Sequence, residues 1–173
     1  MVKKNFVLGL ILAIIFMGCT MLPKKTYKIV KDKNGKDIAV GIIPEKDLLR
    51  EFPSFSAQYK AFVPDSNAVA YLSHFKKPVK VLVFLGTWCP DSRREVPRFL
   101  KALAKAHNPS SIAVKLIAVN RSKIDAENLS KKYKITRVPT FVVFSNQSEV
   151  GRIVEYPKVS MEGDFVKILK TIH

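Results

Sequence analysis

The sequence predicts an α/β domain, because buried strands and helices alternate along its second half. The runs Val79–Leu85 and Ile112–Val119 are almost continuously apolar, as expected of strands that are covered on both faces of a sheet. The order of elements after residue 78 is strand, helix, strand, helix, strand, strand, helix. The 173 residues are 47% hydrophobic and include 2 cysteines, which excludes both a disulfide scaffold and a long disordered chain.

The N-terminus has the features of an export signal. Two lysines precede the uncharged apolar run Phe6–Met17, and Cys19 follows directly after a small residue. This arrangement resembles a bacterial lipoprotein signal, in which the cysteine becomes the lipidated first residue of the mature protein. An uncleaved membrane anchor over Asn5–Leu22 and plain secretion are the alternatives. Since all three place the remaining chain outside the cytoplasm, we expect a signal peptide over 1–18, a lipidated tether over 19–26 and a membrane-anchored, extracytoplasmic protein.

A β-hairpin and two helices are predicted between this tether and the first buried strand. Tyr27–Lys33 and Asp37–Ile43 alternate β-branched and charged residues around Asn34-Gly35, which is a strong signal for a hairpin. A proline then introduces a helix over Glu45–Phe52, and an Asp-Ser pair at residue 65 caps a helix that runs to Phe75. We expect this N-terminal extension, residues 27–77, to pack on a core of residues 78–173.

Four strands and three helices make up the predicted core. The last two strands are joined by a polar turn, Ser145–Ser148, and the closing helix follows a second turn. The predicted strands are Val79–Leu85, Ile112–Val119, Thr140–Phe144 and Val150–Glu155, and the predicted helices are Pro90–His107, Ile124–Tyr133 and Met161–Ile172.

The turn between the first buried strand and its helix carries the candidate active site. Its sequence is Gly86-Thr87-Trp88-Cys89-Pro90-Asp91-Ser92-Arg93-Arg94. Cys89 lies where the unpaired N–H groups and the positive dipole of a new helix favour thiolate over thiol, and Pro90 suits a first helical position. The two arginines favour the anion, whereas Asp91 opposes it. We expect Trp88 to form an apolar wall beside a partly exposed sulfur, and Ser92 to offer that sulfur a hydroxyl donor.

These residues resemble the active-site motif of the thioredoxin-like superfamily, especially of its exported thiol-reductase and cytochrome-maturation branch. A strand followed by Trp-Cys-Pro, a helix with a proline one turn later (Pro97) and a second motif, Arg137-Val138-Pro139-Thr140, occur in the order of that superfamily over about residues 75–173. The resemblance implies a thioredoxin-like fold, with a central mixed β-sheet flanked by helices. It also implies that Pro139 is cis and lies against the sulfur of Cys89, and that the backbone of Val138 holds an extended substrate.

Two departures from the family pattern change the expected chemistry. Ser92 replaces the second cysteine of the C-x-x-C motif, and Val83 stands where many thioredoxins have a buried carboxylate. A dithiol enzyme resolves its mixed disulfide with the second cysteine, whereas a serine cannot attack sulfur. We therefore expect a monothiol site, in which an outside thiol or the client's own second cysteine completes turnover.

Three classes of function fit these residues. The first is thiol–disulfide exchange through a mixed disulfide on Cys89, supported by Trp88, Pro90 and Ser92, with Val138 and Pro139 positioning the substrate. The second is a redox-inactive module that keeps the fold and binds client peptides or proteins. The third, a thiol peroxidase, lacks the expected Pro-x-x-x-Thr-x-x-Cys arrangement. The expected partners are client proteins or low-molecular-weight thiols and disulfides, without a cofactor.

The net charge of +16 favours association with anionic surfaces and does not identify a partner. Lysines at positions 24, 25, 28 and 31 lie beside the membrane if the anchor exists, or form a solvated linker. Nucleic-acid binding is not expected, because the basic residues are spread along the chain among acidic ones and no nucleic-acid-binding motif is present. We expect a monomer without a metal site, since zinc-ligand spacing is absent and His74, His107 and His173 are far apart in the sequence.

Overall fold

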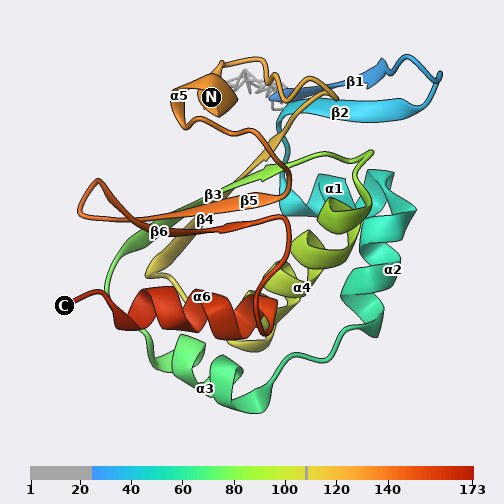
Figure 1. The fold of residues 1–173 in the computed structure, drawn as a ribbon. Coiled ribbons are helices and arrows are strands. Elements are labelled where there is room, and N and C mark those ends of the chain that lie inside the picture. The colour runs from blue at the N-terminus through green and yellow to red at the C-terminus, as the bar shows by residue number, and fades with distance from the viewer. Residues whose placement is uncertain (1–24, 108) are drawn as a thin grey trace, which may run out of the picture.

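The computed structural model describes residues 25–107 and 109–173, so the predicted signal peptide and the lipidation site at Cys19 lie outside the described residues. Within these ranges, six strands form one sheet and six helices pack around it (Figure 1). The strands are β1 (Tyr27–Lys31), β2 (Asp37–Ile42), β3 (Val79–Leu85), β4 (Ile112–Ala118), β5 (Thr140–Ser145) and β6 (Ser148–Val154). The helices are α1 (Glu45–Glu51), α2 (Pro53–Ala61), α3 (Ser66–His74), α4 (Pro90–Lys105), α5 (Leu129–Lys132) and α6 (Met161–Lys170).

The sheet has the strand order β1-β2-β4-β3-β5-β6, and the predicted α/β class with a central mixed sheet is confirmed. β3 and β4 are parallel, and every other neighbouring pair is antiparallel. β3 lies between two strands and is buried at every position except Lys80, which explains its apolar sequence. β2 pairs with β4 only at Gly41 and Ile42, so most of the β1–β2 hairpin extends past the edge of the central sheet.

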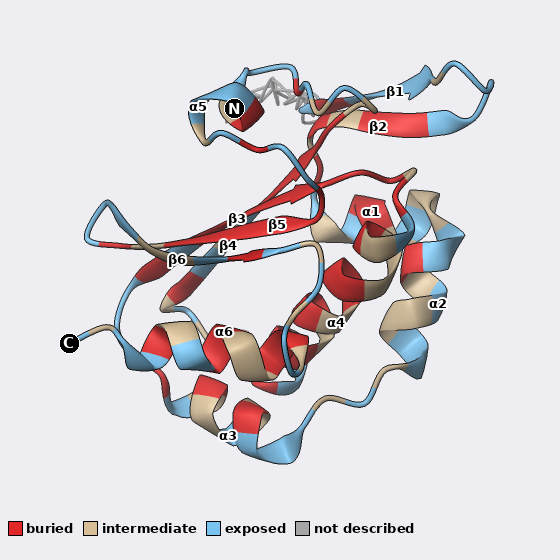
Figure 2. Ribbon diagram, viewed as in Figure 1, coloured by how far each residue is buried: buried red, intermediate tan, exposed pale blue. Residues whose placement is uncertain are grey.

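Two hydrophobic clusters lie on opposite faces of the sheet, because successive side chains of a strand point to opposite sides. The helix-side core includes Val81, Val83 and Leu85 of β3 and is covered by α1, α2, α3, α4 and α6 (Figure 1). On the other face, where Figure 1 shows only the short α5 among the described helices, lies the site-side cluster. Its buried members are Leu82, Phe84, Cys89, Ile117, Val119, Ile135, Val138 and Val142. Figure 2 shows the buried residues concentrated in the sheet and on the inner sides of α4 and α6.

Two segments differ from the predicted helices. α2 was not predicted, because Pro53 ends α1 and also suits the first turn of a new helix, which buries Phe55 completely. The helix predicted over Ile124–Tyr133 is reduced to the four residues of α5. There the carboxylate of Asp125 accepts hydrogen bonds from the N–H groups of three residues, and Asn128 adopts a positive φ of 55°. These local bonds hold a loop in place of the first helical turns.

The remaining predicted elements are present, with ends that differ by a few residues. β6 starts two residues earlier than predicted, because Asn146 and Gln147 alone form the turn after β5, both with positive φ. The predicted cap of α3 is confirmed, since the Asp65 side chain accepts a hydrogen bond from the N–H of Ala68 at 2.8 Å.

Candidate active site

Cys89 occupies the N-cap position of α4, after the loop that leaves β3. Pro90 is the first residue of the helix, and the carbonyl of Cys89 accepts the hydrogen bond from the N–H of Arg93. The N-cap position and the proline that follows are therefore as the sequence predicted. The expected partial exposure is wrong, because Cys89 is only 6% exposed and belongs to the site-side cluster.

The two sequence motifs meet at the sulfur atom. The Val138–Pro139 peptide bond is cis, as the family resemblance implies. The thiol of Cys89 donates a hydrogen bond to the carbonyl oxygen of Val138, with Sγ and O 3.2 Å apart. Both Val138 and Pro139 are buried, so this carbonyl is one of the groups that cover the sulfur. The structure therefore brings together residues that are 49 positions apart in the sequence.

Ser92 does not make the contact expected of it. Its side chain is fully buried, and its hydroxyl oxygen accepts a hydrogen bond from the backbone N–H of Gly86 at 3.1 Å. The spacing of three residues does place it on the Cys89 side of the helix start, but the N–H at the end of β3 needs an acceptor and takes this oxygen. In this arrangement Ser92 fixes the loop before Cys89, and the hydrogen bond of the Cys89 sulfur goes to Val138 instead.

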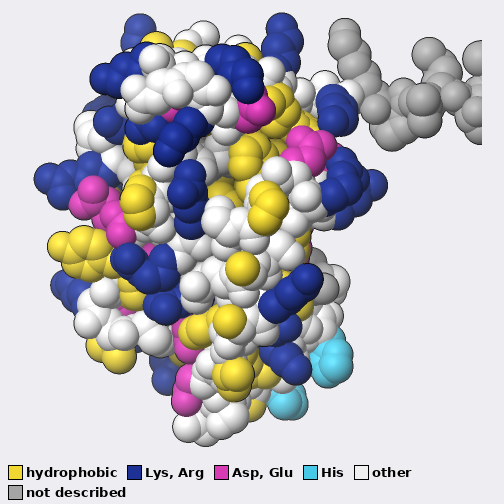
Figure 3. Space-filling view, turned by 90° about the vertical axis from the view of Figure 1, so that its right-hand side faces the viewer, with side chains coloured by type: hydrophobic (Ala, Val, Ile, Leu, Met, Phe, Trp, Pro, Cys, Tyr) yellow, Lys and Arg dark blue, Asp and Glu magenta, His cyan; other side chains and the backbone are white. Residues whose placement is uncertain are grey.

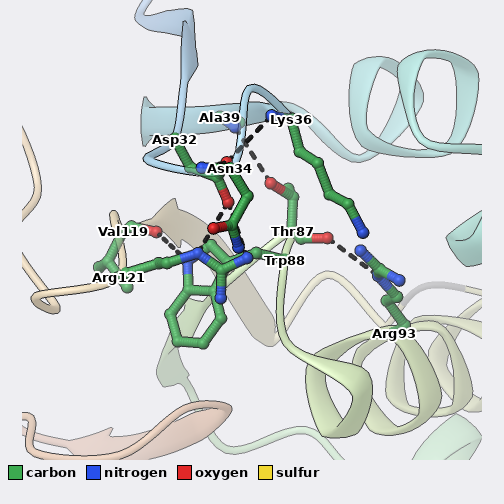
Figure 4. Close-up of polar contacts among 9 residues, drawn as sticks. All are labelled: Asp32, Asn34, Lys36, Ala39, Thr87, Trp88, Arg93, Val119 and Arg121. Atoms are coloured by element: carbon green, nitrogen blue, oxygen red, sulfur yellow. Dashed lines mark hydrogen bonds and ion pairs between the residues drawn. The ribbon is translucent and has the colours of Figure 1, made fainter.

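Trp88 is held by three neighbours. Its indole N–H donates to the carbonyl of Val119, with Nε1 and O 3.0 Å apart. Gly86 leaves room for the ring, because a Cβ atom there would lie 2.7 Å from Trp88 Cε2. The guanidinium of Arg121 lies over the ring, with Cζ 5.1 Å from the ring centroid, which is within cation–π range (Figure 4). Trp88 packs on the site-side cluster that contains Cys89, so the expected apolar wall is present.

Thr87 links the active-site loop to two other elements. Its hydroxyl oxygen accepts a hydrogen bond from the N–H of Ala39 in β2 at 3.1 Å, and its carbonyl accepts one from Nε of Arg93 at 3.0 Å (Figure 4). Arg94, which was expected to favour a thiolate at Cys89, instead pairs with Asp91 and Glu95. Its hydrogen bond to Glu95 is the main cause of the raised pKa of Arg94.

Two residues of the site, Asp32 and Arg121, were missed by sequence reasoning. The Asp32 carboxylate accepts hydrogen bonds from the N–H groups of Asn34 and Lys36 and pairs with Arg121 at 2.7 Å. Desolvation acts to raise the pKa of Asp32, but the bonds from Lys36, Arg121 and Asn34 together lower it below its ordinary value. An aspartate two residues before an Asn-Gly turn signals the local bonds, whereas nothing in the sequence signals the pairing with a residue 89 positions away.

Metal-binding clusters, membrane-spanning helices and basic patches are other features through which the described ranges could carry a function. These ranges contain no group of three or more His, Cys, Asp or Glu side chains that could hold a metal ion. None of the helices from residue 25 onward is long and apolar enough to cross a membrane. Lys and Arg side chains are scattered among hydrophobic and polar ones on the face that Figure 3 shows, without a continuous basic patch.

Comparisons with known proteins give the family and the fold of the chain. A thioredoxin from Echinococcus granulosus is 34% identical over 77 residues, which are 43% of this chain and 65% of that relative, so the match spans slightly less than two thirds of its length. The crystal structure of an HIV epitope scaffold has a TM-score of 0.53 at 18% identity and covers 75% of this chain and 86% of its own. Thioredoxin O2 from Arabidopsis thaliana has a TM-score of 0.42 at 16% identity, over 60% and 84% of the two chains. The family model described as thioredoxin matches residues 50–167, and this chain therefore belongs to the thioredoxin family.

Proposed function

We propose that this protein performs monothiol thiol–disulfide exchange through a mixed disulfide on Cys89. The observation that carries the proposal is the position of the sulfur, at the N-terminus of α4 and 3.2 Å from the carbonyl of Val138, which precedes the cis-proline. A helix N-terminus stabilises a thiolate, and the Val138 backbone provides a polar group beside it for an extended client segment. The family membership supports the same general class of redox chemistry.

The exchange would proceed in two balanced steps. The Cys89 thiolate attacks one sulfur of a client disulfide, a Cys89–client disulfide forms, and the other client sulfur leaves as a thiolate that takes up a proton. A second thiol, either a low-molecular-weight thiol or another cysteine of the client, then loses its proton and attacks the client sulfur of the mixed disulfide. A new disulfide forms between these two sulfurs, and Cys89 leaves as the thiolate. Among the described residues Cys89 is the only cysteine, and Ser92 cannot act as an internal resolving group.

The burial of Cys89 specifies what a client has to displace. Because the Cys89 residue is only 6% exposed, a client has to displace the bond between the thiol and the Val138 carbonyl. The same burial favours the alternative function, a redox-inactive module that binds clients beside Pro139 without reaction. The two functions differ in whether a covalent client adduct forms at Cys89.

We further propose that the chain works outside the cytoplasm, as a monomer attached to a membrane through a lipid on Cys19. The basis for this part is the apolar run that precedes Gly18-Cys19. Metabolic labelling with a palmitate analogue tests it: the expected result is labelled protein that loses the label in the Cys19→Ala variant. An unlabelled wild-type protein would contradict the lipid anchor and leave the chemistry at Cys89 unaffected.

The exchange itself is tested by trapping. The purified protein is incubated with a peptide disulfide, quenched in acid and digested, and the adduct is located by mass spectrometry. We expect an adduct on Cys89 that reduced glutathione releases, and none at this position in the Cys89→Ser variant. If the folded protein forms no adduct under conditions in which the denatured chain reacts readily, the protein is a binding module.

A second variant tests whether the missing resolving thiol limits the reaction. Ser92→Cys restores a cysteine three residues after Cys89, and residues at this spacing are neighbours on a helix. Because intramolecular attack has a high effective concentration, reduction of a protein disulfide should rise by about tenfold or more. Unchanged reduction would indicate that the environment of Cys89 no longer supports exchange.

A further inference from the structure

The β1–β2 hairpin contacts the active-site loop, although it lies before residue 50, where the match to the thioredoxin family model begins. Figure 4 shows the two elements face to face, with Asp32, Lys36 and Ala39 of the hairpin opposite Thr87 and Trp88 of the loop. The contacts include polar bonds that are buried or partly buried. The contacts occur at two separate points.

The first point is the bond between Ala39 and Thr87. Ala39 pairs with Ile29 of β1 but lies beyond the residues of β2 that pair with β4, so its N–H can reach the loop. It donates to Thr87 Oγ1 at 3.1 Å, and both residues are buried. This bond fixes the residue two positions before the nucleophile.

The second point is a chain of contacts from Asp32 through Arg121 to Trp88. The Asp32 carboxylate, whose side chain is 2% exposed, accepts from Nε of Arg121 and also pairs with a terminal nitrogen of that guanidinium. Both nitrogens contact the same oxygen, Oδ2, so Asp32 holds the guanidinium in position by a charge-assisted contact. The Cζ atom of this guanidinium lies over the indole of Trp88, whose ring is also held by Val119 and by the close approach of Gly86.

We propose that the hairpin is a positioning element of the thiol site, and that Asp32 and Arg121 are positioning residues that hold Trp88 in place beside Cys89. The inference rests on the proposed exchange function, because the hairpin is proposed to keep Trp88, the wall against which a client docks, in a fixed position. Release of Arg121 would free one side of the indole. Small reagents would then reach the sulfur more easily, while a client would lose a rigid surface.

The test uses the full chain, whose only tryptophan is Trp88. The variants are Asp32→Asn, which keeps an oxygen for the turn amides but removes the charge that holds Arg121, and Arg121→Gln. The matched control is Asp37→Asn, which removes the same charge from the same hairpin by breaking the exposed Lys31–Asp37 pair. Three quantities are measured: acrylamide quenching of Trp88 fluorescence, alkylation of Cys89 by iodoacetamide, and mixed-disulfide formation with a peptide disulfide.

For Asp32→Asn and Arg121→Gln we expect quenching and alkylation to rise by about threefold, the size of one exposed cation–π contact, and mixed-disulfide formation to fall by a similar factor. Asp37→Asn should match the wild type in all three. Arg121→Lys should give values between those of Arg121→Gln and the wild type, because it keeps a cation over the ring and one bond to Asp32. A merely structural role of the hairpin would lower stability without moving the two reaction rates in opposite directions.

The outcomes separate this inference from the exchange function. If the wild type forms mixed disulfides and both variants do so at its rate with unchanged Trp88 quenching, the hairpin does not position the site and the exchange function stands. If neither the wild type nor any variant forms a mixed disulfide but quenching and alkylation rise in Asp32→Asn and Arg121→Gln, the hairpin does hold Trp88 and the exchange function fails.

Discussion

The helix-side core and the site-side cluster share the same strands, yet they differ in what covers them. Along β3, Val81 and Val83 face five helices, whereas Leu82 and Phe84 face the loops around Cys89 and the four-residue α5. The helix-side core is made of large interlocking side chains, such as Phe99 between Phe141 and Phe165. The site-side cluster is smaller, and the residues around its thiol are also held by single hydrogen bonds to backbone groups.

This difference suggests that the helix-side core provides most of the stability of the fold, whereas the site-side cluster holds the reactive thiol. Residues of the helix-side core can be exchanged only at the cost of packing, because protein interiors are close-packed. In the site-side cluster, the carbonyl of Val138 is paired only with the Cys89 thiol among the hydrogen bonds of the described residues, and a client can replace this bond. The comparison therefore predicts large stability losses on the helix side and smaller losses, with changes in reactivity, on the site side.

The largest effect is expected for Phe99→Ala. Phe99 is 1% exposed, and its ring centroid lies 5.2 Å from that of Phe141 and 5.1 Å from that of Phe165. Deletion of such a ring leaves a cavity and should cost about 3–5 kcal/mol of unfolding free energy, measured by urea denaturation. Phe99→Leu should lose clearly less. A loss below about 1 kcal/mol would show that the helices collapse onto the gap, and the helix-side core would then not be rigid.

The next largest effect is expected for Ser92→Ala. Its hydroxyl is the acceptor for the buried N–H of Gly86, so the substitution leaves this donor without a partner and should cost about 1–3 kcal/mol. The control is Ser73→Ala in α3, where the hydroxyl is exposed and bonds to the carbonyl one turn before it. Equal denaturation midpoints for Ser92→Ala and the wild type would indicate that water replaces the hydroxyl and that this bond does not fix the loop.

A smaller loss is expected for Tyr133→Ala, the counterpart of Phe99→Ala in the site-side cluster. The Tyr133 ring lies 6.0 Å from Phe84 and 5.4 Å from Phe144, measured between centroids, and is only partly buried. Loss of these aromatic contacts should cost about 1 kcal/mol in urea denaturation. A cost equal to that of Phe99→Ala would remove the distinction between the two faces.

The parts of the fold that could be predicted are those with a local physical signal. The β3 run is apolar because both faces of the strand are covered, and the Asp65 cap has its partner three residues away. α2 escaped prediction because a proline ends one helix and begins another equally well. The β1–β2 pairing followed from its Asn-Gly turn, whereas the contact of this hairpin with the thiol loop has no local signal.

The site was predicted to a different depth at each residue. The place of Cys89 at a helix start follows from Cys-Pro after a buried strand, and its contact with Val138 could be expected only from the family resemblance. The direction of the Ser92 hydroxyl could not be predicted, because spacing gives a helix face and says nothing of which neighbouring backbone group lacks a partner. The burial of Cys89 depends on loops that come together only in the folded chain.

The smallest effect concerns the root of the hairpin, where Tyr27 of β1 donates a hydrogen bond to Glu51 at the end of α1. The hydrogen bond from Tyr27 is the main cause that lowers the pKa of Glu51 from its ordinary value of 4.5 to about 2. Desolvation acts in the opposite direction, and hydrogen bonds from Lys25 and Arg50 add to the lowering. A carboxyl group whose pKa is lower in the folded state stabilises the fold above pH 4.5, and this contribution is lost as the pH falls toward 2. Glu51→Gln should therefore reduce the fall of the thermal midpoint between these two pH values.

The matched control lies at the other end of the same helix and has the opposite sign. Burial raises the pKa of Glu45, so this group disfavours the folded state at neutral pH and ceases to do so as it becomes protonated. Glu45→Gln should therefore raise the midpoint at pH 7 and steepen its fall in acid, whereas Glu51→Gln flattens it. If the thermal midpoints of the two variants fell in parallel from pH 7 to pH 2, both pKa directions, lowered for Glu51 and raised for Glu45, would be contradicted. The hairpin root would then contribute no charge-dependent stability, and the contacts of Asp32 and Ala39 would have to hold the hairpin beside the thiol site.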